Sequence, residues 1–259
     1  PYVDNVKLNC TSEACTGSMI RESYVMDCWF DSGCASFAQW HYPFENKEKF
    51  ENSFPVDYIC EAVDQTRGWF YSLLAVSTTV FDSVSYKRCL SLGHILDNHG
   101  KKMSKSRGNV INPWDHFNKE GTDAIRWYMT SQSAPWNPMN FDPNGVRETY
   151  AKMFLTLWNV HRFHLDYAIL DNFDYDKDFI PVEDRGELDR WILSKISSVA
   201  ESYHNDYVSW QFHKAARDLE NFVINDLSNW YVRRSRRRLW EEAESHDKRA
   251  CQFTLHEVL

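Results

Sequence analysis

The sequence lacks several features that would place it in a familiar class of protein. It has no apolar run long enough to span a membrane and no signal peptide. Its seven cysteines are an odd number without regular spacing, which argues against a disulfide scaffold and indicates a reducing compartment. An excess of basic residues is also missing: the net charge is -8, so any contact with nucleic acid must be local. Internal repeats and low-complexity tracts are absent from the sequence.

What the sequence does contain is material for a packed core. The chain has 259 residues, of which 43% are hydrophobic, and it carries 11 Trp and 16 Phe, more than a disordered segment would have. This length suits one large domain or two small ones. The first residue is Pro1 rather than Met, directly in structured-looking sequence, and we interpret the chain as a fragment of a longer protein.

Hydrophobic periodicity divides the chain into an α/β part and an α part. In the first part, strands are predicted at 57–60 and 89–92 with a helix starting at Thr66 between them, an order that indicates a parallel sheet with helical crossovers. The second part contains three long amphipathic helices, which predict a helical bundle. Their apolar faces run from Tyr150 to Trp158, from Leu188 to Tyr203 and from Leu219 to Tyr231. We therefore predict domains at 1–134 and 146–259, joined by a Pro- and Asn-rich linker at 135–145.

A cationic segment, Gly100 to Asn109, follows the second predicted strand, and we call it the lysine loop. It holds four cations within seven residues, interleaved with Ser and flanked by Gly. Glycine allows tight turns, and lysine supplies a compact charge suited to phosphates. For an arbitrary Lys- and Ser-rich loop, a solvated basic turn is the better interpretation. Here, however, the string Lys-Met-Ser-Lys-Ser at 102–106, with Gly-Asn-Val-Ile-Asn-Pro at 108–113, resembles the signature loop of class I aminoacyl-tRNA synthetases.

This resemblance implies a role for the loop in ATP chemistry. Lys102 and Lys105 would stabilise charge on the ATP phosphates while an amino-acid carboxylate attacks the α-phosphate, with Lys105 as the transition-state contact and with Mg²⁺ present. Met103 and Ser104 belong to the same ATP-binding segment. His94, just past the second predicted strand, stands where the family contacts the nucleotide, although a lone His near a loop is more often structural.

A second motif lies where the first predicted strand meets its helix. Ligands of open α/β sheets bind beyond the carboxyl ends of the strands, and carboxylates there can accept from a ligand ammonium or ribose hydroxyl. Helix capping by Asp64 is the alternative. The decapeptide at 61–70 resembles the Glu-Gly-x-Asp-Gln-x-Arg-Gly-Trp-Phe motif of isoleucyl-tRNA synthetases, with Ala62 in place of Gly. The resemblance implies that Glu61 contacts the aminoacyl-adenylate and that Asp64 and Gln65 hold its polar groups.

Two tryptophans complete the expected amino-acid pocket. Trp69 is the ninth residue of the motif above, and Trp29 lies in Asp-Cys-Trp-Phe-Asp-Ser-Gly at 27–33, which resembles another segment of the same family. Two indole faces make a rigid apolar slot suited to a branched aliphatic side chain. The alternative is two core tryptophans in a Trp-rich chain.

An arginine-rich stretch at 228–238 marks the end of the last predicted helix. Arginine matches phosphate geometry, and Trp230 or Tyr231 could stack on a base. The alternative is that the arginines pair with the acidic residues that follow, namely Glu241, Glu242 and Glu244. The stretch resembles a helix of the anticodon-binding domain of isoleucyl-tRNA synthetases, which implies tRNA contact by Trp230, Arg233, Arg234, Arg236 and Arg237.

A cysteine pair near the start of the chain is a weaker candidate for a metal site. Related enzymes often have a Cys-x-x-Cys half of a zinc ribbon at this place, whereas Cys10 and Cys15 are spaced more widely. Half a site cannot hold zinc tightly. We therefore expect no metal in this chain alone and allow Zn²⁺ only in a longer parent protein.

Taken together, the resemblance implies an α/β plus α fold: the C-terminal part of a Rossmann-type catalytic domain, then a helical-bundle anticodon-binding domain. The parent would convert isoleucine and ATP to isoleucyl-adenylate and transfer the isoleucyl group to tRNA(Ile). We expect a cytoplasmic protein, similar to cytosolic eukaryotic or archaeal versions, with a multi-synthetase complex as a partner in eukaryotes. The His-x-Gly-His element of class I synthetases is absent, so this chain alone should be inactive. The alternatives are a tRNA-binding or scaffold module without catalysis, and a valyl- or leucyl-tRNA synthetase.

Overall fold

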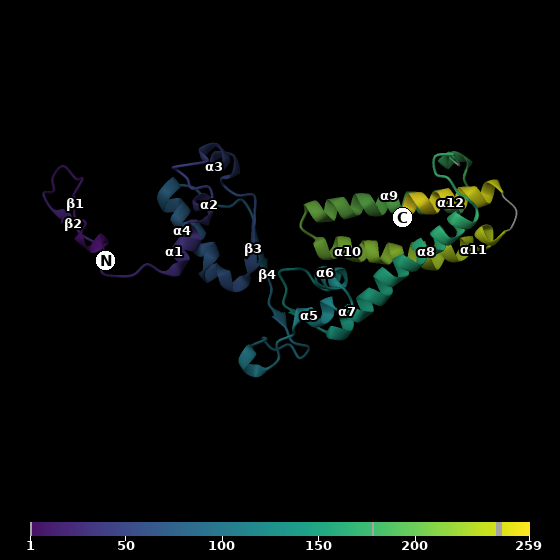
Figure 1. Cartoon of the computed structure of the whole chain (residues 1–259), viewed down its shortest axis with the longest axis horizontal. Coiled ribbons are helices and arrows are strands. Elements are labelled where there is room, and N and C mark those ends of the chain that lie inside the picture. The colour runs from purple at the N-terminus through teal and green to yellow at the C-terminus, as the bar shows by residue number, and fades with distance from the viewer. Residues whose placement is uncertain (1, 178, 242–244) are drawn as a thin grey trace. The chain divides into compact units, whose positions relative to one another are not determined.

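The computed structural model describes residues 2–177, 179–241 and 245–259. The chain forms two compact units, Pro1–Ser91 and Leu92–Leu259 (Figure 1). None of the helices among the described residues combines the length and the apolar character needed to cross a membrane.

The first unit opens with a small antiparallel hairpin and continues into short helices. In the hairpin, Leu8 pairs with Met19 and Asn9 pairs with Ser18. The elements of this part are η1 (Val3–Asn5), β1 (Leu8–Asn9), β2 (Ser18–Met19), α1 (Cys28–Gly33), α2 (Ala35–Ala38) and α3 (Lys47–Ser53).

A strand–helix–strand segment forms the rest of the first unit. It consists of β3 (Ile59–Ala62), the 3₁₀ turn η2 (Val63–Arg67), α4 (Trp69–Phe81) and β4 (Cys89–Leu92), and β3 pairs with β4. A parallel bridge between Val56 and Tyr86 leads into this pairing. The core of the segment is Ile59, Phe70 and Leu73. The predicted strand–helix–strand order is therefore confirmed.

Two boundaries in this segment differ from the prediction. The first strand starts at Ile59 rather than at residue 57, because Asp57 is exposed and its carboxylate pairs with Lys87 at 2.9 Å. The α-helix starts at Trp69 rather than Thr66, because Gly68 has non-helical φ and ψ angles of -140° and -111°.

The second unit begins with a short parallel sheet and small helices. Its strands pair in register, Ile95 with Met139 and Leu96 with Asn140. Its elements up to residue 170 are β5 (Ile95–Leu96), η3 (Lys105–Arg107), α5 (Pro113–Phe117), α6 (Thr122–Ser131), β6 (Met139–Asn140), α7 (Pro143–Thr149), the π-helical turn η4 (Tyr150–Phe154) and α8 (Leu155–Leu170).

The segment predicted as a linker, 135–145, is packed structure rather than a free connection. It contains β6, and Met139 and Phe141 are buried in a cluster with Tyr128 and Val146. A side-chain hydrogen bond also connects α6 of this region to a later helix, α10 (Phe212–Asn221). The indole N–H of Trp127 donates to Glu220 at 3.0 Å.

The predicted helical bundle is confirmed, and a further helix joins it. The remaining elements are η5 (Val182–Asp184), α9 (Glu187–Val208), α10 (Phe212–Asn221), the π-helical η6 (Phe222–Val232), α11 (Arg233–Trp240) and α12 (His246–Val258). Helices α9 and α10 lie side by side (Figure 1). The bundle core includes Ile192, Phe222, Leu227, Tyr231 and Leu255. Trp158 and Trp230, expected on apolar faces, are 61% and 47% exposed.

Candidate functional site

In the first unit, the packing of α1 against α4 brings the neighbourhoods of the two predicted pocket tryptophans together. Asp27 caps α1 by accepting from the Trp29 amide at 2.8 Å. The Trp69 indole N–H donates to the Ser32 carbonyl of α1 at 3.0 Å. Gly68 lies between them: a Cβ there would come within 3.4 Å of the Trp29 ring. The same Cβ would lie 2.8 Å from the Gln65 side-chain oxygen, so a glycine here leaves room chiefly for Gln65.

The acidic motif adds polar groups to the same place. The Gln65 side-chain oxygen accepts from the Trp69 amide at 3.0 Å, so Gln65 satisfies the first amide of α4. The expected alternative role of Asp64 as the helix cap is therefore wrong. Asp64 lies in η2 and Glu61 in β3, and both are exposed. Within the described residues neither carboxylate has an ion pair, so both are available to a ligand.

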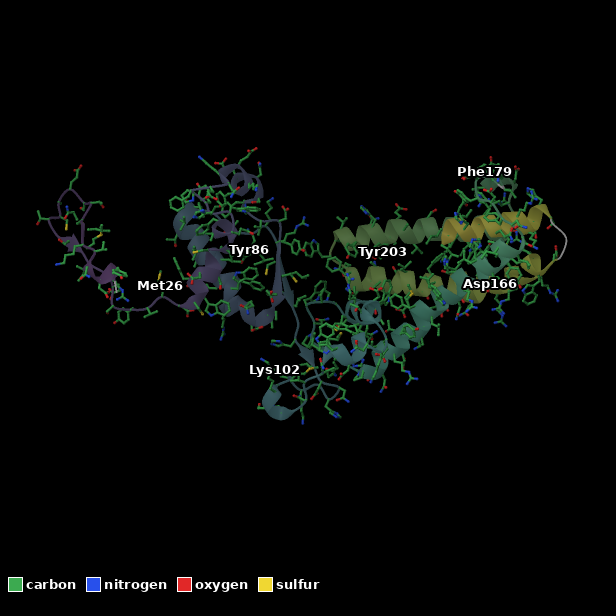
Figure 2. The ribbon with its side chains drawn as sticks, in the orientation of Figure 1. Met26, Tyr86, Lys102, Asp166, Phe179 and Tyr203 are labelled. Carbon is green, nitrogen blue, oxygen red and sulfur yellow. The ribbon has the colours of Figure 1, made fainter. Side chains whose placement is uncertain are left out.

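In the second unit, the lysine loop leaves β5 and returns beside it. Lys102 forms an antiparallel bridge with Leu96, and Figure 2 marks Lys102 in this loop. Lys102 and Lys105 are exposed, and no ion pair to either occurs among the described residues. Met103 packs against the cluster of Tyr128 and Phe141. The loop thus partly buries its methionine and leaves its two motif lysines in solvent.

His94 precedes β5 and is held through its backbone. Its carbonyl accepts from the Met139 amide at 3.0 Å. Gly93, directly before it, approaches the backbone of Asn137 so closely that an added Cβ would lie 2.2 Å away. The imidazole is half-buried. This fixes the position of His94 at the start of the lysine-loop strand.

One residue of this region was missed by sequence reasoning. This residue is Asp97, whose carboxylate is buried and accepts from Asn109, Lys101 and His99. The Asn109 side chain, followed by backbone amides, lowers the pKa of Asp97. No local signal was available, because Asp97 follows β5, a two-residue strand outside the predicted strand at 89–92.

The arginine-rich helix α11 presents four of its five arginines to solvent. Arg233, Arg234, Arg236 and Arg237 are exposed, and Arg234 stacks over the Trp230 ring with its guanidinium carbon 4.0 Å from the ring centroid. No ion pair to these four occurs in the part of the chain that the structure describes. Of the expected alternative partners, Glu241 therefore pairs with none of them, and Glu242 and Glu244 lie outside the described residues.

The remaining arginine and the tyrosine of this stretch belong to the core. Arg238 makes a bidentate pair with the buried Asp189 at 2.7 and 2.6 Å and also contacts Asp247 at 2.8 Å. The Tyr231 hydroxyl donates to Asp189 at 2.6 Å, and burial raises the pKa of Tyr231 well above its ordinary value. The expectation that Tyr231 could stack on a base is wrong, because the ring is fully buried.

Cys10 and Cys15 flank the turn of the N-terminal hairpin. The Cys10 amide donates to the Gly17 carbonyl at 3.0 Å, and the Gly17 amide donates to the Cys15 sulfur at 3.4 Å. The Gly17 amide and then the Cys10 side chain lower the pKa of Cys15, which favours its thiolate. The turn therefore brings two sulfur groups together. No group of three or more metal-ligating side chains occurs among the described residues.

Comparison with known proteins places these features in a family. Residues 4–142 match the family described as tRNA synthetases class I (I, L, M and V), and residues 189–259 match the anticodon-binding domain of tRNA ligases. The chain belongs to the class I tRNA synthetases. The first match ends inside the predicted linker at 135–145.

Individual relatives of this synthetase chain are bacterial. It is 51% identical to an isoleucine–tRNA ligase of Clostridium novyi and 46% identical to one of Cytophaga hutchinsonii, in both cases over the whole chain. The chain spans only about a quarter of the length of these relatives, 25% and 23% respectively. They give no support to the expected likeness to eukaryotic or archaeal versions.

Solved structures of class I synthetases share the fold at low sequence identity. One is a ternary complex of Agrobacterium radiobacter K84 agnB2 LeuRS with tRNA and LeuAMS, with a TM-score of 0.71, 18% identity, and coverage of 97% of this chain and 31% of that one. Another is Mycobacterium tuberculosis methionyl-tRNA synthetase with methionyl-adenylate, with a TM-score of 0.73, 17% identity, and coverage of 93% and 49%. The predicted fold, a catalytic-domain segment followed by an anticodon-binding domain, is confirmed.

Proposed function

We propose that this chain is a segment of an isoleucine–tRNA ligase. The complete protein would activate isoleucine with ATP to isoleucyl-adenylate and transfer the isoleucyl group to tRNA(Ile). The observation that carries the proposal is identity of about half of all positions, along the whole chain, to proteins named isoleucine–tRNA ligase. By itself the chain would not form adenylate, because it lacks the His-x-Gly-His element.

The geometry of the lysine loop supports a role in adenylate formation. Adenylyl transfer needs positioned charge more than covalent chemistry from the protein. Two exposed lysines without ion pairs in the described structure, Lys102 and Lys105, supply mobile cations from a backbone that Met103 attaches to the core. Met103 and Ser104 would bind ATP through this same backbone, and His94 would contact the nucleotide.

The pocket for isoleucine and its adenylate would come from the first unit. Trp29 and Trp69 would enclose the branched side chain, and the exposed carboxylates of Glu61 and Asp64 would accept hydrogen bonds from the adenylate. Gln65 uses its oxygen on the Trp69 amide, so its NH₂ group is the part left to donate to a ligand.

Contact with tRNA is assigned to α11. The exposed Trp230, Arg233, Arg234, Arg236 and Arg237 form a cationic surface with an aromatic ring, which suits phosphate contact and base stacking. We keep domain boundaries of 1–134 and 146–259 as part of this proposal.

The remaining expectations concern ions and location. Mg²⁺ would enter with ATP, since this ion is commonly held by substrate phosphates with few protein ligands. Zn²⁺ is proposed only for the longer protein, where Cys10 and Cys15 would supply half of a site. A cytoplasmic location and a multi-synthetase complex stay predictions from the family resemblance.

The test is isoleucine-dependent ATP–pyrophosphate exchange by the full-length protein. Lys105→Ala should lower the exchange rate about 100-fold or more, the loss typical of removing a group that stabilises transition-state charge. Lys119→Ala, which removes an exposed lysine outside the loop, is the matched control and should leave the rate unchanged.

Two other outcomes would favour the alternatives. Exchange driven better by valine or leucine than by isoleucine would identify a sister synthetase. A full-length protein that binds tRNA but supports exchange with none of the three amino acids would be a tRNA-binding or scaffold module.

A further inference from the structure

A buried carboxylate stands at the base of the lysine loop. Asp97 directly follows β5 and is only 8% exposed. One carboxylate oxygen accepts from the amides of His99 at 2.9 Å and Lys101 at 2.8 Å, and the other accepts from the Asn109 side chain at 2.8 Å. The Asp97 carboxylate therefore binds backbone amides at the start of the loop and the Asn109 side chain at the end of the loop.

Asn109 completes this connection from the other end. Its side-chain oxygen accepts from the Ser104 amide at 2.9 Å, and its NH₂ group donates to the Lys102 carbonyl at 3.3 Å as well as to Asp97. Ser104 directly precedes Lys105. The Asp97–Asn109 pair thus reaches the backbone beside both motif lysines without touching either ammonium group.

The backbone of the two lysines is therefore held by hydrogen bonds, whereas their side chains are not held. Their side chains are exposed and have no ion pairs in the described structure, whereas the backbone that carries them is hydrogen-bonded to two polar side chains. A cation held at its backbone and free at its tip can meet a phosphate without first ordering the loop. Such pre-organisation matters because small misplacements of a reacting group reduce rates strongly.

We propose that Asp97 and Asn109 are positioning residues for adenylate formation. Their hydrogen-bonded pair holds the lysine loop in one backbone conformation, from which Lys102 and Lys105 reach the ATP phosphates. The catalytic consequence rests on the proposed function of the two lysines. The ordering of the loop by the pair does not depend on that function and can be measured separately.

Exchanging the two side chains gives a sharp test in the full-length protein. Asp97→Asn places an NH₂ group against the NH₂ group of Asn109, and Asn109→Asp places two carboxylates at hydrogen-bonding distance. The double variant, Asp97→Asn with Asn109→Asp, restores one donor and one acceptor across the pair and leaves oxygens for the Ser104, His99 and Lys101 amides. It does not restore the 3.3 Å bond to the Lys102 carbonyl, because a carboxylate at position 109 has no hydrogen to donate. Each single variant should therefore be defective, and the double variant should recover.

The first readout is the rate at which trypsin cuts the folded protein after Lys101, Lys102, Lys105 and Arg107, followed by mass spectrometry. Each single variant should be cut in the loop about tenfold faster, the effect of losing one buried hydrogen bond. Asn98→Asp is the charge-matched control for Asn109→Asp, because it adds one negative charge beside Asp97 on an exposed side chain. Its rate of loop cleavage should equal that of the unchanged protein.

The second readout is ATP–pyrophosphate exchange. The single variants should lose about 100-fold in kcat/KM for ATP, as expected for a misplaced reacting group, with the KM for isoleucine unchanged. The double variant should regain most of this loss. A merely structural pair would change stability without this selective loss and recovery.

The outcomes separate this inference from the proposed function. Equal loop cleavage in all variants, or faster cleavage in Asn98→Asp as well, would overturn the ordering role. Faster cleavage with unchanged exchange, in a protein that loses exchange on Lys105→Ala, would overturn the positioning role alone. If Lys105→Ala itself retains exchange, the proposed function of the lysines fails, whatever the cleavage shows.

Discussion

The lysine loop and helix α11 both present exposed cations, but different forces hold them in place. In the loop, one buried carboxylate and one amide side chain contact the backbone around Lys102 and Lys105. In α11, the bundle core holds the helix, and the Arg238–Asp189 pair is buried beneath the exposed arginines. The contrast shows that the number of cations in a stretch does not tell which of them face a ligand. Arg238 is identical in type to its neighbours, and what distinguishes it is its pairing with Asp189 of α9 and Asp247 of α12.

The largest expected effect concerns the stability of the helical bundle, which the buried partner of Arg238 supports. Arg238→Ala leaves Asp189 buried without its counter-charge and should reduce the free energy of unfolding by about 3–5 kcal/mol. Arg237→Ala, on the exposed side of the same helix, should change it by no more than about 0.5 kcal/mol. Urea unfolding of both variants checks the difference. Equal destabilisation by the two substitutions would show that Arg238 does not brace the bundle.

Much of this arrangement could be predicted from local sequence. Strand β4 matches the prediction residue for residue, and the buried faces of the long helices follow from their apolar spacing. The neighbourhoods of Trp29 and Trp69 do meet, as the resemblance of their segments to one family implied.

What could not be predicted depends on partners that are distant in sequence. Strand β6 has two residues and no periodicity, so it exists only through pairing with β5 and looked like part of a linker. The roles of Asp97 and Arg238 are decided by Asn109 and Asp189, and no local pattern indicates those partners. Likewise, Gln65 rather than Asp64 satisfies the first amide of α4 because Gly68 delays the helix.

The effect of intermediate size is the response to low pH, which should destabilise the helical bundle before it disorders the lysine loop. Burial, followed by the nearby His256 and His161, lowers the pKa of His164 from 6.5 to about 4. Between these values the unfolded chain binds a proton that the folded chain does not, so the free energy of unfolding should fall as the pH drops, by roughly 3 kcal/mol for the whole window.

Asp97 responds in the same sense but in a lower pH window. Its pKa is lowered in the folded protein, chiefly by Asn109, so its contribution is intact above the ordinary pKa of 3.8 and is lost only as the pH falls through the lower folded value. Around pH 5 the bundle should therefore weaken while the loop stays ordered. Unfolding measured against pH, with His164→Gln as the variant that removes the titrating group, checks the first half. Trypsin is far from its pH optimum at pH 5, so the order of the loop is checked by hydrogen exchange of the Lys101 and Ser104 amides.

The smallest effect per residue tests the exposed arginines of α11. An arginine that contacts a tRNA phosphate should weaken binding by about 1 kcal/mol when it is changed to Ala. The same change should reduce the slope of log affinity against log salt by about one unit. The arginines to test are Arg233, Arg234, Arg236 and Arg237. Trp230→Ala should weaken binding by about 1–3 kcal/mol if the ring stacks on a base, with the salt slope nearly unchanged. Affinity for tRNA measured at several salt concentrations separates the two kinds of contact. Arg126→Ala is the matched control, because Arg126 is exposed on α6 and lies outside this surface. If Arg126→Ala loses as much affinity as Arg233→Ala, α11 contributes only general positive charge.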